Sequence, residues 1–256
     1  KRQKDNKTIK HIISLQQRKY RQKFGEYTVE GIRAVTDIGK KDFLRSILIR
    51  ESKRSELEPL VQKGFTVSSV YVVQDPIFDK IEHSVNGQGI LGIAKKCVND
   101  LHSLIVEDGL YVALDGVQDP GNLGTIIRTA VAAGAKGIFL LKGTVDPYNE
   151  KCVRSTMSAL CNIPIFEDVT LSEFYDFIKD NTIKTYVTSL ENAKPYHTIS
   201  YPKRTMIILG NEGNGVSREI IEMCDQAITI PLYGDIESLN VSIAAALCMY
   251  KVREQI

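Results

Sequence analysis

Three stretches near the end of the chain decide how it folds: TMIILGNEGNG at Thr205–Gly215, AITIPL at Ala227–Leu232 and SLNVSIAAAL at Ser238–Leu247. Each contains an apolar segment or a short loop that leads into glycine, asparagine or serine. Polar loops that directly follow buried strands are the places where α/β proteins bind ligands. The sequence therefore predicts a ligand pocket formed by loops near the end of the chain.

Short apolar strands alternate with helices throughout this part of the chain. The expected strands are Tyr111–Val117, Gly137–Leu141, Pro164–Phe166, Lys184–Ser189, Thr205–Leu209 and Ala227–Ile230. The expected helices are Leu123–Ala133, Glu150–Leu160, Leu171–Asn181, Val216–Cys224 and Leu239–Arg253. Short apolar strands joined by helical crossovers are typical of a parallel sheet with both faces covered. We therefore predict an α/β domain over residues 109–256.

The first 96 residues have a different character. Within residues 1–24, nine lysines and arginines stand against Asp5 alone, a net charge of +8 that leaves −6 on the remaining chain. Apolar spacing over residues 7–24 predicts a helix with a basic outer side. A basic arm on a small module without a catalytic constellation is typical of a domain that binds a polyanion such as nucleic acid, although a solvated tail is an alternative. We expect residues 97–108 (CVNDLHSLIVED) to be a linker.

Residues 25–96 alternate strands and helices and so predict a compact α/β unit. The expected strands are Tyr27–Val29, Arg45–Ile49, Thr66–Val73 and Gln88–Ala94. The expected helices are Glu30–Ile38, Ser55–Lys63 with Gly64 as its stop, and Pro76–His83. The position of Pro76 directly after an aspartate is common at a helix N-terminus.

Composition excludes several classes of protein. Hydrophobic residues make up 43% and charged residues 25%, which is ordinary for a globular protein, and no apolar run approaches the roughly 18 residues of a membrane span. No apolar region follows the N-terminal charges as in a secretory signal, so we expect a cytoplasmic protein without membrane contact. Because the first residue is Lys1, we expect a start residue before it. The five cysteines form no C-x-x-C pair and the four histidines no metal spacing, so we expect buried free thiols and no metal.

Conventional nucleotide-binding motifs are missing from the sequence. No G-x-x-x-x-G-K-[ST] string occurs, which argues against a P-loop. Gly210, Gly213 and Gly215 have the spacing G-x-x-G-x-G, the reverse of the dinucleotide fingerprint, and they lie near the end of the domain. A conventional dinucleotide enzyme is therefore disfavoured.

Three strings place polar residues in unusual settings. LDGVQDPGNLGTIIRTA at Leu114–Ala130 presents Asn122 after a turn and Arg128 on an otherwise apolar helix. Glu212 lies between glycines in the second string, and Ser238–Asn240 open the last helix in the third. Each string has a plain structural alternative: a surface arginine, a connecting loop with an exposed carboxylate, and a serine helix cap.

In this order, the three strings resemble the SpoU family of RNA ribose 2′-O-methyltransferases over about residues 110–254. The residues after the second strand are also similar to the family's pattern: Asp146–Asn149, Lys151, Val153 and Arg154. One departure is Ser158, where the family often has glycine. Through Val29–Gly31 and Gln88–Leu91, residues 1–96 resemble the RNA-binding domain, similar to a ribosomal protein, that some members carry.

The resemblance implies a parallel sheet whose C-terminal part is threaded into a deep trefoil knot, and a homodimer formed through the knotted domain and the last helix. It implies S-adenosyl-L-methionine as the cofactor, bent among the loops Leu209–Gly215, Ile230–Gly234 and Ser238–Val241. Backbone groups would make most of its contacts, and glycine would allow close approach. The implied cofactor residues are Leu209, Gly210, Asn211, Gly213, Ile230, Leu232, Ser238, Leu239 and Asn240.

The family's polar catalytic set corresponds here to Asn122, Arg128, Glu212, Ser238 and Asn240. A ribose 2′-hydroxyl that attacks a sulfonium methyl group needs a base or a well-placed anion. Arg128 is the family's usual candidate for orienting or activating the hydroxyl, but a guanidinium stays protonated below about pH 12, so we favour clamping of the substrate phosphate. Ser238 and Asn240 would then position Arg128 and the ribose, and Glu212 would support its loop or a neighbouring subunit.

We therefore predict an enzyme that methylates a ribose of structured RNA. Ribosomal RNA of the 23S type is the first choice, because the additional domain resembles a ribosomal protein, and transfer RNA is the second. Two alternatives stay open: an RNA-binding or ribosome-assembly factor without turnover, and a knotted methyltransferase that acts on a base.

Overall fold

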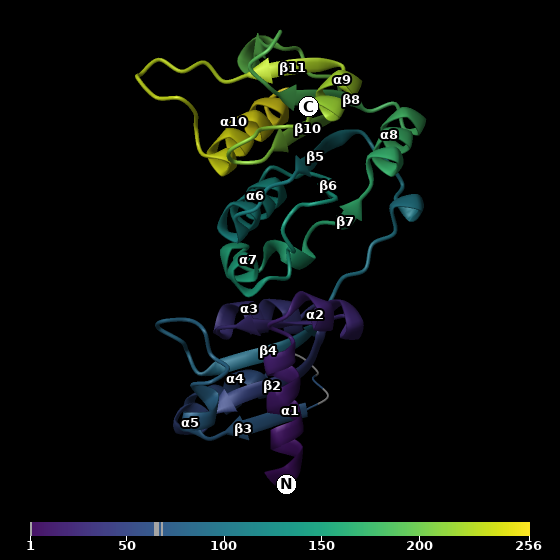
Figure 1. Cartoon of the computed structure of the whole chain (residues 1–256). Helices are drawn as coiled ribbons and strands as arrows, with labels where there is room; N and C mark the ends of the chain where they lie inside the picture. Colours follow the sequence, from purple (N-terminus) through teal and green to yellow (C-terminus); the bar gives the residue numbers. More distant parts are fainter. Residues whose placement is uncertain (1, 64–66, 68) are drawn as a thin grey trace. The chain divides into compact units, whose positions relative to one another are not determined.

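The computed structural model describes residues 2–63, 67 and 69–256, with side chains described from residue 7 onward. The chain divides into two compact units (Figure 1). Unit 1 contains Lys1–Lys96 and Tyr148–Cys161, and unit 2 contains Cys97–Pro147 and Asn162–Ile256. The domain limits and the linker expected from the sequence stay a prediction, and each unit is described here by itself.

Unit 2 is built on a seven-stranded sheet in the order β7-β6-β5-β10-β8-β11-β9. All of its neighbouring strands are parallel, which confirms the predicted sheet. The strands are β5 (Gly109–Asp115), β6 (Gly137–Leu141), β7 (Ile165–Val169), β8 (Lys184–Thr188), β9 (Lys194–Pro195), β10 (Arg204–Gly210) and β11 (Gln226–Thr229). Asp115 pairs with Gly210, so β5 and β10 end side by side.

Helices cover both faces of this sheet (Figure 1). On one face, Tyr111, Phe139 and Met206 pack with Phe174 of α8 and Ile220 of α9 in a single core cluster. The alternate strand residues on the other face are also buried, and α10 packs there against α6, β10 and β5. The helices are α6 (Pro120–Ala132), α8 (Leu171–Asp180), α9 (Arg218–Met223) and α10 (Val241–Arg253), with short 3-10 helices η2 (Leu101–Ser103) and η4 (Tyr196–Thr198).

Unit 1 has a four-stranded sheet in the order β1-β4-β2-β3, in which β2 and β3 are parallel and the other pairs antiparallel. This confirms the small α/β module. Its elements are β1 (Glu26–Glu30), α3 (Ile32–Gly39), β2 (Leu44–Arg50), η1 (Glu51–Lys53), α4 (Arg54–Gln62), β3 (Ser69–Val73), α5 (Asp75–Phe78) and β4 (Ile90–Lys95). The predicted stop at Gly64 and strand start at Thr66 lie outside the described residues.

The N-terminal segment forms two helices, so the single helix predicted over residues 7–24 is wrong. They are α1 (Arg2–Ser14) and α2 (Arg18–Phe24). The buried Arg21 of α2 stabilises this break, because its guanidinium donates hydrogen bonds to the carbonyl oxygens of Leu15 (2.9 Å) and Gln16 (2.8 Å) just beyond α1. Carbonyls at a helix end need such donors.

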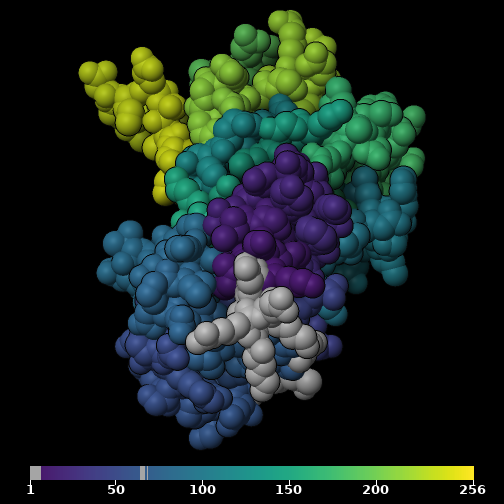
Figure 2. Space-filling view, turned by 60° about the horizontal axis from the view of Figure 1, so that its bottom comes forward, coloured from purple at the N-terminus to yellow at the C-terminus, as the bar shows by residue number. Residues whose placement is uncertain are grey.

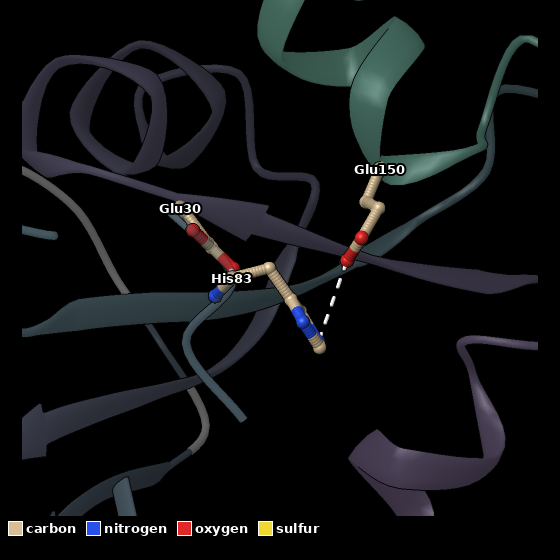
Figure 3. Close-up of side chains that lie close together, drawn as sticks. All are labelled: Glu30, His83 and Glu150. Atoms are coloured by element: carbon tan, nitrogen blue, oxygen red, sulfur yellow. Dashed lines mark hydrogen bonds and ion pairs between the residues drawn. The ribbon is translucent and has the colours of Figure 1, made fainter. Parts of the chain in front are cut away.

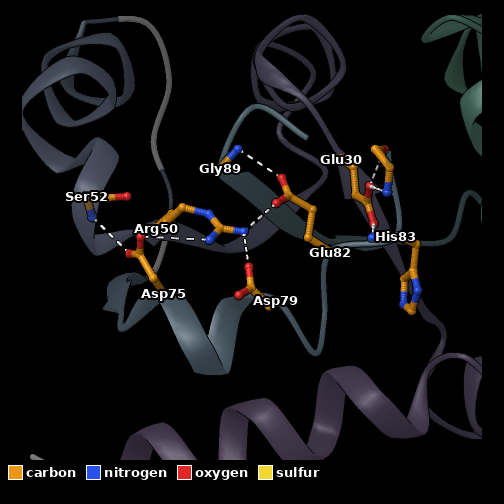
Figure 4. Close-up of polar contacts among 9 residues, drawn as sticks. Glu30, Arg50, Ser52, Asp75, Asp79, Glu82, His83 and Gly89 are labelled. Carbon is orange, nitrogen blue, oxygen red and sulfur yellow. Dashed lines mark hydrogen bonds and ion pairs between the residues drawn. The ribbon is translucent and has the colours of Figure 1, made fainter. Parts of the chain in front are cut away.

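Arg50 ties strand β2 to the chain that leads into β4 (Figure 4). Its guanidinium donates to Glu82 and Asp79, each at 2.7 Å, and lies over the ring of Phe78. Glu82 also accepts from the backbone N–H of Gly89 at 2.9 Å. The hydrogen bond to Glu82, against burial, raises the pKa of Arg50 above its usual value. This pairing holds the loop before β4 in one place.

The segment between β6 and β7 carries helix α7 (Glu150–Ser155) and the 3-10 helix η3 (Ala159–Cys161), and it belongs to unit 1. A helix to Leu160 was expected, and this is wrong because Met157 (φ 47) and Ser158 (φ 71) have left-handed backbone conformations. Glycine adopts this conformation without penalty, whereas other residues lose about 1 kcal/mol. Ser158 therefore occupies a position that suits the family's usual glycine.

The structure also bears on two expectations from composition, namely that no segment spans a membrane and that the cysteines are buried free thiols. Among the described residues, no helix is long and apolar enough to cross a membrane. All five cysteines are free thiols. Cys152 and Cys248 are buried as expected, while Cys97, Cys161 and Cys224 are only partly buried.

Candidate active site

The loop after β10 is closed by its own hydrogen bonds. The backbones of Asn211 and Gly215 exchange two hydrogen bonds, at 2.9 and 3.0 Å. The side-chain oxygen of Asn211 accepts from the N–H groups of Gly213 and Asn214, and its amide nitrogen donates to the carbonyl of Gly116 after β5. The loop is thus fixed both internally and to the neighbouring strand end.

Gly210 is required by the backbone of this loop. A Cβ atom at position 210 would lie 2.2 Å from the carbonyl carbon of Gly215 and 2.3 Å from the nitrogen of Val216. Backbone atoms cannot move aside as a flexible side chain can. At Gly213, by contrast, a Cβ would find its nearest neighbour at 3.5 Å, an ordinary contact. The two predicted cofactor-binding glycines therefore differ in their structural constraint.

Glu212 projects from the loop toward the start of α6. Its carboxylate accepts from the N–H groups of Gln118 (3.1 Å) and Asp119 (3.0 Å) and from the side-chain amide of Asn122 (3.3 Å). Burial alone would raise the pKa of Glu212, but these hydrogen bonds outweigh it and hold the pKa below its usual value. An ionised carboxylate at a helix N-terminus is favourable. A carboxylate whose oxygens are engaged in this way is a poor base and a good support.

Asn122 belongs to the first turn of α6. Asp119 caps this helix by accepting from the N–H of Asn122 at 2.8 Å, with Pro120 as the first helical residue. The sequence placed a turn at residues 119–122 and started the helix at Leu123, and the start is wrong because Asp-Pro is itself a helix start here. The cap fixes the backbone of Asn122 and aims its side chain at both Glu212 and Asn240.

Asn240 joins the last helix to the same group. Its side-chain oxygen caps α10 by accepting from the N–H of Ser242 at 2.8 Å, and its amide donates to the side-chain oxygen of Asn122 at 3.1 Å. Because Asn240 is the cap, the helix begins at Val241 instead of Leu239, and the alternative of a cap at Ser238 is wrong. Asn122 therefore links Glu212 to Asn240, and one residue from each of the three strings lies in a single hydrogen-bonded chain.

Arg128 and Ser238 do not take part in the hydrogen bonds that link Glu212, Asn122 and Asn240. Both side chains are exposed, and neither makes a hydrogen bond or ion pair within the part of the protein that the structure describes. Arg128 lies on α6, two turns beyond Asn122. The structure thus brings together three members of the predicted catalytic set and leaves the arginine and the serine available to a ligand.

The loop between β11 and α10 is open. It extends away from the sheet in Figure 1, and Tyr233 (93%) and Ile236 (61%) are largely exposed. Between residues 231 and 239, which the structure describes throughout, the single backbone hydrogen bond runs from the N–H of Ile236 to the carbonyl of Gly234. Most peptide groups here are free to bind a ligand.

The donor set fits S-adenosylmethionine as the ligand. Leu209 is buried at the end of β10, and Ile230 and Leu239 are half-buried beside free backbone groups. Such a mixture of apolar side chains and peptide donors and acceptors suits a molecule with an aromatic base and polar edges. The assignment of individual cofactor contacts, Leu232 and Asn211 included, stays a prediction.

Some residues of the site were not found from the sequence. Asp119 supplies the cap of α6, and the Asp-Pro pair was its signal. Asp115 at the end of β5 accepts from the N–H of Ser217 at 2.7 Å and so ties the far side of the β10 loop to the sheet. The side-chain amide of Gln118 donates to the carbonyls of Gly116 and Gly143. The hydrogen bonds from Ser217 to Asp115 and from Gln118 to Gly143 join distant segments, and no local pattern signals them.

One further group of side chains, which could coordinate a metal ion, lies in unit 1, where Glu30, His83 and Glu150 approach one another (Figure 3). His83 Nε2 lies 3.4 Å from Glu150. The carboxylate of Glu30, however, already accepts from the N–H groups of His83 and Ser84 and from the Ser84 hydroxyl. These bonds explain the position of Glu30 without an ion, and the expectation of no metal stays a prediction.

Unit 2 is a parallel sheet with helices on both faces, and two asparagines and a carboxylate are joined at its carboxyl edge beside a loop of free peptide groups. This arrangement fits the class of α/β enzymes that bind a cofactor at the ends of their strands. Residues 109–250 match the family described as the SpoU rRNA methylase family, and residues 6–92 match an MRM3-like substrate binding domain. The chain belongs to the SpoU rRNA methylase family. This confirms the predicted family, the class of enzyme (an RNA 2′-O-ribose methyltransferase) and the use of S-adenosylmethionine.

Similar proteins span almost the whole chain. The 23S rRNA (guanosine(2553)-2′-O)-methyltransferase RlmP of Bacillus subtilis is 33% identical over 97% of this chain and 96% of its own length. An AdoMet-bound rRNA methyltransferase from Sinorhizobium meliloti is 30% identical and superimposes with a TM-score of 0.86, over 98% of this chain and 96% of its own. The SpoU methyltransferase AviRb from Streptomyces viridochromogenes, at 23% identity, shares the fold with a TM-score of 0.89 over 97% of both chains.

Proposed function

We propose that this protein methylates a ribose 2′-hydroxyl of large-subunit (23S-type) ribosomal RNA. The observation that carries the proposal is the chain Glu212–Asn122–Asn240, which joins the three strings into one polar site. The match of residues 6–92 to a substrate binding domain and the similarity to RlmP along the whole chain support ribosomal RNA as the substrate.

The two exposed polar side chains act on the substrate. Arg128 binds the phosphate beside the target ribose, because a planar guanidinium can donate two parallel hydrogen bonds to phosphate oxygens. Ser238 and Asn240 orient the 2′-hydroxyl, and Asn122 and Glu212 hold Asn240 in position. The cofactor supplies an activated methyl group. These residues contribute orientation, which by itself can lower a barrier by several kcal/mol, about 7 to 11 in the best cases.

The strand order supports the threaded knot implied by the family. Strand β10 lies between β5 and β8 although it follows β8 in the chain, and β11 then pairs with the other edge of β8. The chain would pass through its own earlier loop between these strands, and the three loops of the cofactor pocket would be parts of that knot.

A homodimer through α10 is the second part of the proposal. The exposed side of this helix carries Ile243 (52%), Leu247 and Tyr250. Val252 and Cys248 on the same helix are buried in the core of unit 2. Large apolar side chains grouped on one exposed helix face mark an interaction surface. A cytoplasmic location follows from the ribosomal substrate.

Mapping of ribose methylation in total RNA tests the proposal. Cells with and without the protein are compared, and we expect one 2′-O-methyl group in large-subunit ribosomal RNA that depends on the protein. A dependent mark in transfer RNA, or on a base after digestion to nucleosides, would identify the alternative substrate. Calorimetry with S-adenosylmethionine gives the other arm, since failure to bind it would indicate an RNA-binding factor without turnover.

A further inference from the structure

Helix α2 of unit 1 carries a repeated pair in its sequence RKYRQKF. A lysine precedes an aromatic residue twice, as Lys19-Tyr20 and Lys23-Phe24, four residues apart. Residues four apart lie one above the other on a helix. The helix therefore presents a stripe of lysines beside a stripe of aromatic rings, and both lie in the N-terminal segment, coloured purple at the surface in Figure 2.

The rings and cations are close to one another. The rings of Tyr20 and Phe24 are nearly parallel, with centroids 6.3 Å apart and an angle of 13° between their planes. The ammonium of Lys19 lies 4.8 Å from the centroid of Tyr20, and that of Lys23 lies 5.4 Å from Phe24. Phe24 is 40% exposed, although phenylalanine is among the residues most often buried.

The ring of Phe24 is held in place from behind. His11 of α1 meets it edge-on with centroids 4.7 Å apart, and His11 is itself hydrogen-bonded to Glu26 of β1. Such support gives an exposed ring little freedom to turn. A side chain that is already fixed loses little conformational entropy when a planar base stacks on its ring.

Beyond their contacts with the two rings, the lysines have no acidic partner within their own helix. No acidic residue occurs in α2, so Lys19 and Lys23 face each other as like charges, which weakens a helix. Arg21 differs from them, because it is buried and caps α1. The two exposed lysines therefore suit an anion outside the chain, whereas the arginine between them serves the fold.

We infer that α2 is a stacking site for unpaired RNA bases, with Tyr20 and Phe24 contacting bases and Lys19 and Lys23 contacting the adjoining phosphates. This inference rests on the proposed function and specifies which part of the RNA unit 1 recognises. Base stacking on aromatic rings within a basic groove is a general means of binding single strands. Bases in a duplex are already stacked on each other, so the site selects an unpaired segment.

The chain offers a matched control in unit 2. Tyr175 on α8 is 47% exposed, and Lys179 lies 6.0 Å from its ring centroid. The pair resembles those of α2, but Glu173, Asp176 and Asp180 lie on the same helix. This acidic surrounding repels phosphates, so an exposed ring with a lysine here is not expected to bind RNA.

Tryptophan fluorescence tests the site directly because the chain contains no tryptophan. The variants Phe24→Trp and Tyr175→Trp each carry one reporter in the full-length protein. Each is titrated with a short oligoadenylate and with duplex RNA of equal length. We expect the single strand to quench the emission of the α2 reporter and leave the α8 reporter unchanged, and the duplex to quench neither.

Affinity measurements give the second readout. Phe24→Leu, which keeps an apolar side chain but removes the ring, should weaken oligoadenylate binding about tenfold, whereas Tyr175→Leu should not. Replacement of both lysines by glutamine should reduce the slope of log affinity against log salt by about 1.4, or about 0.7 for each cation.

Three results would overturn the stacking site. These are an unquenched α2 reporter while oligoadenylate is bound, equal quenching by the duplex, and unchanged affinity of Phe24→Leu in a variant whose thermal unfolding matches wild type. Calorimetry with S-adenosylmethionine on the same variants separates this outcome from failure of the proposed function, because the cofactor binds in unit 2 and should bind all of them equally.

Discussion

Two loops at the carboxyl edge of the unit 2 sheet differ sharply. In the loop after β10, the N–H groups of residues 211, 213, 214 and 215 all have acceptors, and a side chain anchors it to the neighbouring strand end. In the loop after β11, described from 231 to 239, one backbone hydrogen bond is made, and Tyr233 is almost fully exposed. Both loops belong to the same predicted cofactor pocket.

The difference separates parts that are built in advance from parts that a ligand completes. The same division applies to the predicted catalytic set. Asn122 is hydrogen-bonded to both Glu212 and Asn240. The side chains of Arg128 and Ser238 make no such bond within the described part of the protein. A fixed frame reduces the entropy lost on binding, and free donors are required for contact with substrate. Changes to the fixed part should therefore affect stability and activity together, and changes to the open part should affect activity alone.

The largest expected effect is that of Arg128→Ala on methyl transfer. Loss of a charged donor aimed at the substrate phosphate should lower kcat/KM by about 100- to 1000-fold, by analogy with loss of an oxyanion donor. Because Arg128 has no partner in the described chain, thermal unfolding and cofactor affinity should stay at wild-type values. The matched control is Arg218→Ala, an exposed arginine on α9 that pairs with Glu222. A wild-type kcat/KM for Arg128→Ala would show that Arg128 does not bind the substrate phosphate.

The fixed loop is tested by Gly210→Ala. The added methyl group meets backbone atoms, so the free energy of unfolding should fall by about 1 to 3 kcal/mol, and calorimetry should show weakened binding of S-adenosylmethionine. Gly213→Ala, three residues away in the same loop, adds a methyl group at an ordinary distance and should unfold like wild type. If the two variants have the same free energy of unfolding, the backbone of residues 215 and 216 does not lie as close to Gly210 as in the structure.

Glu212→Gln tests the carboxylate by its pH dependence. The folded pKa of Glu212 lies below its usual value, so its contribution to stability is present above about pH 4.5 and is lost as pH falls through the folded pKa. At neutral pH the free energy of unfolding of the wild type should be higher than that of the variant by at most about 1 kcal/mol, since the carboxylate is exposed to solvent. The two proteins should converge in acid. Denaturant unfolding at several pH values measures this, and a constant difference would contradict it.

Ser238→Ala should have the smallest effect. Removal of one uncharged hydrogen bond to substrate costs about 0.5 to 1.5 kcal/mol, so kcat/KM should fall about 2- to 10-fold. Thermal unfolding should not change, because Ser238 does not cap α10. A clear loss of stability would instead favour the interpretation of Ser238 as a helix cap, with Ser242→Ala as a reference for a residue bonded to the actual cap.

The sequence predicts six of the seven strands of unit 2, because each of these six is short and largely apolar, and it misses β9, which has only the two residues Lys194 and Pro195. Helix limits were less accurate where side chains act as caps. Asp-Pro stands at the start of both α5 and α6, but Asp75 is the first residue of α5, which has Gln74 as its cap, whereas Asp119 is itself the cap of α6. The helix expected over Pro76–His83 ends at Phe78.

The site was predicted from resemblance, and its internal bonding was not. The three strings identify Asn122, Glu212 and Asn240, but residues about 90 and 118 positions apart can be joined only by the folded sheet. Contacts between distant parts of the chain leave no local pattern.

Amide hydrogen exchange with and without S-adenosylmethionine tests the contrast between the two loops most directly. In the free protein, residues 211–215 should exchange slowly and residues 231–239 rapidly. Addition of the cofactor should slow exchange in residues 231–239 and change residues 211–215 little. Rapid exchange of both loops in the free protein, or no protection of residues 231–239 by the bound cofactor, would contradict a pocket that is half built in advance and half completed by its ligand.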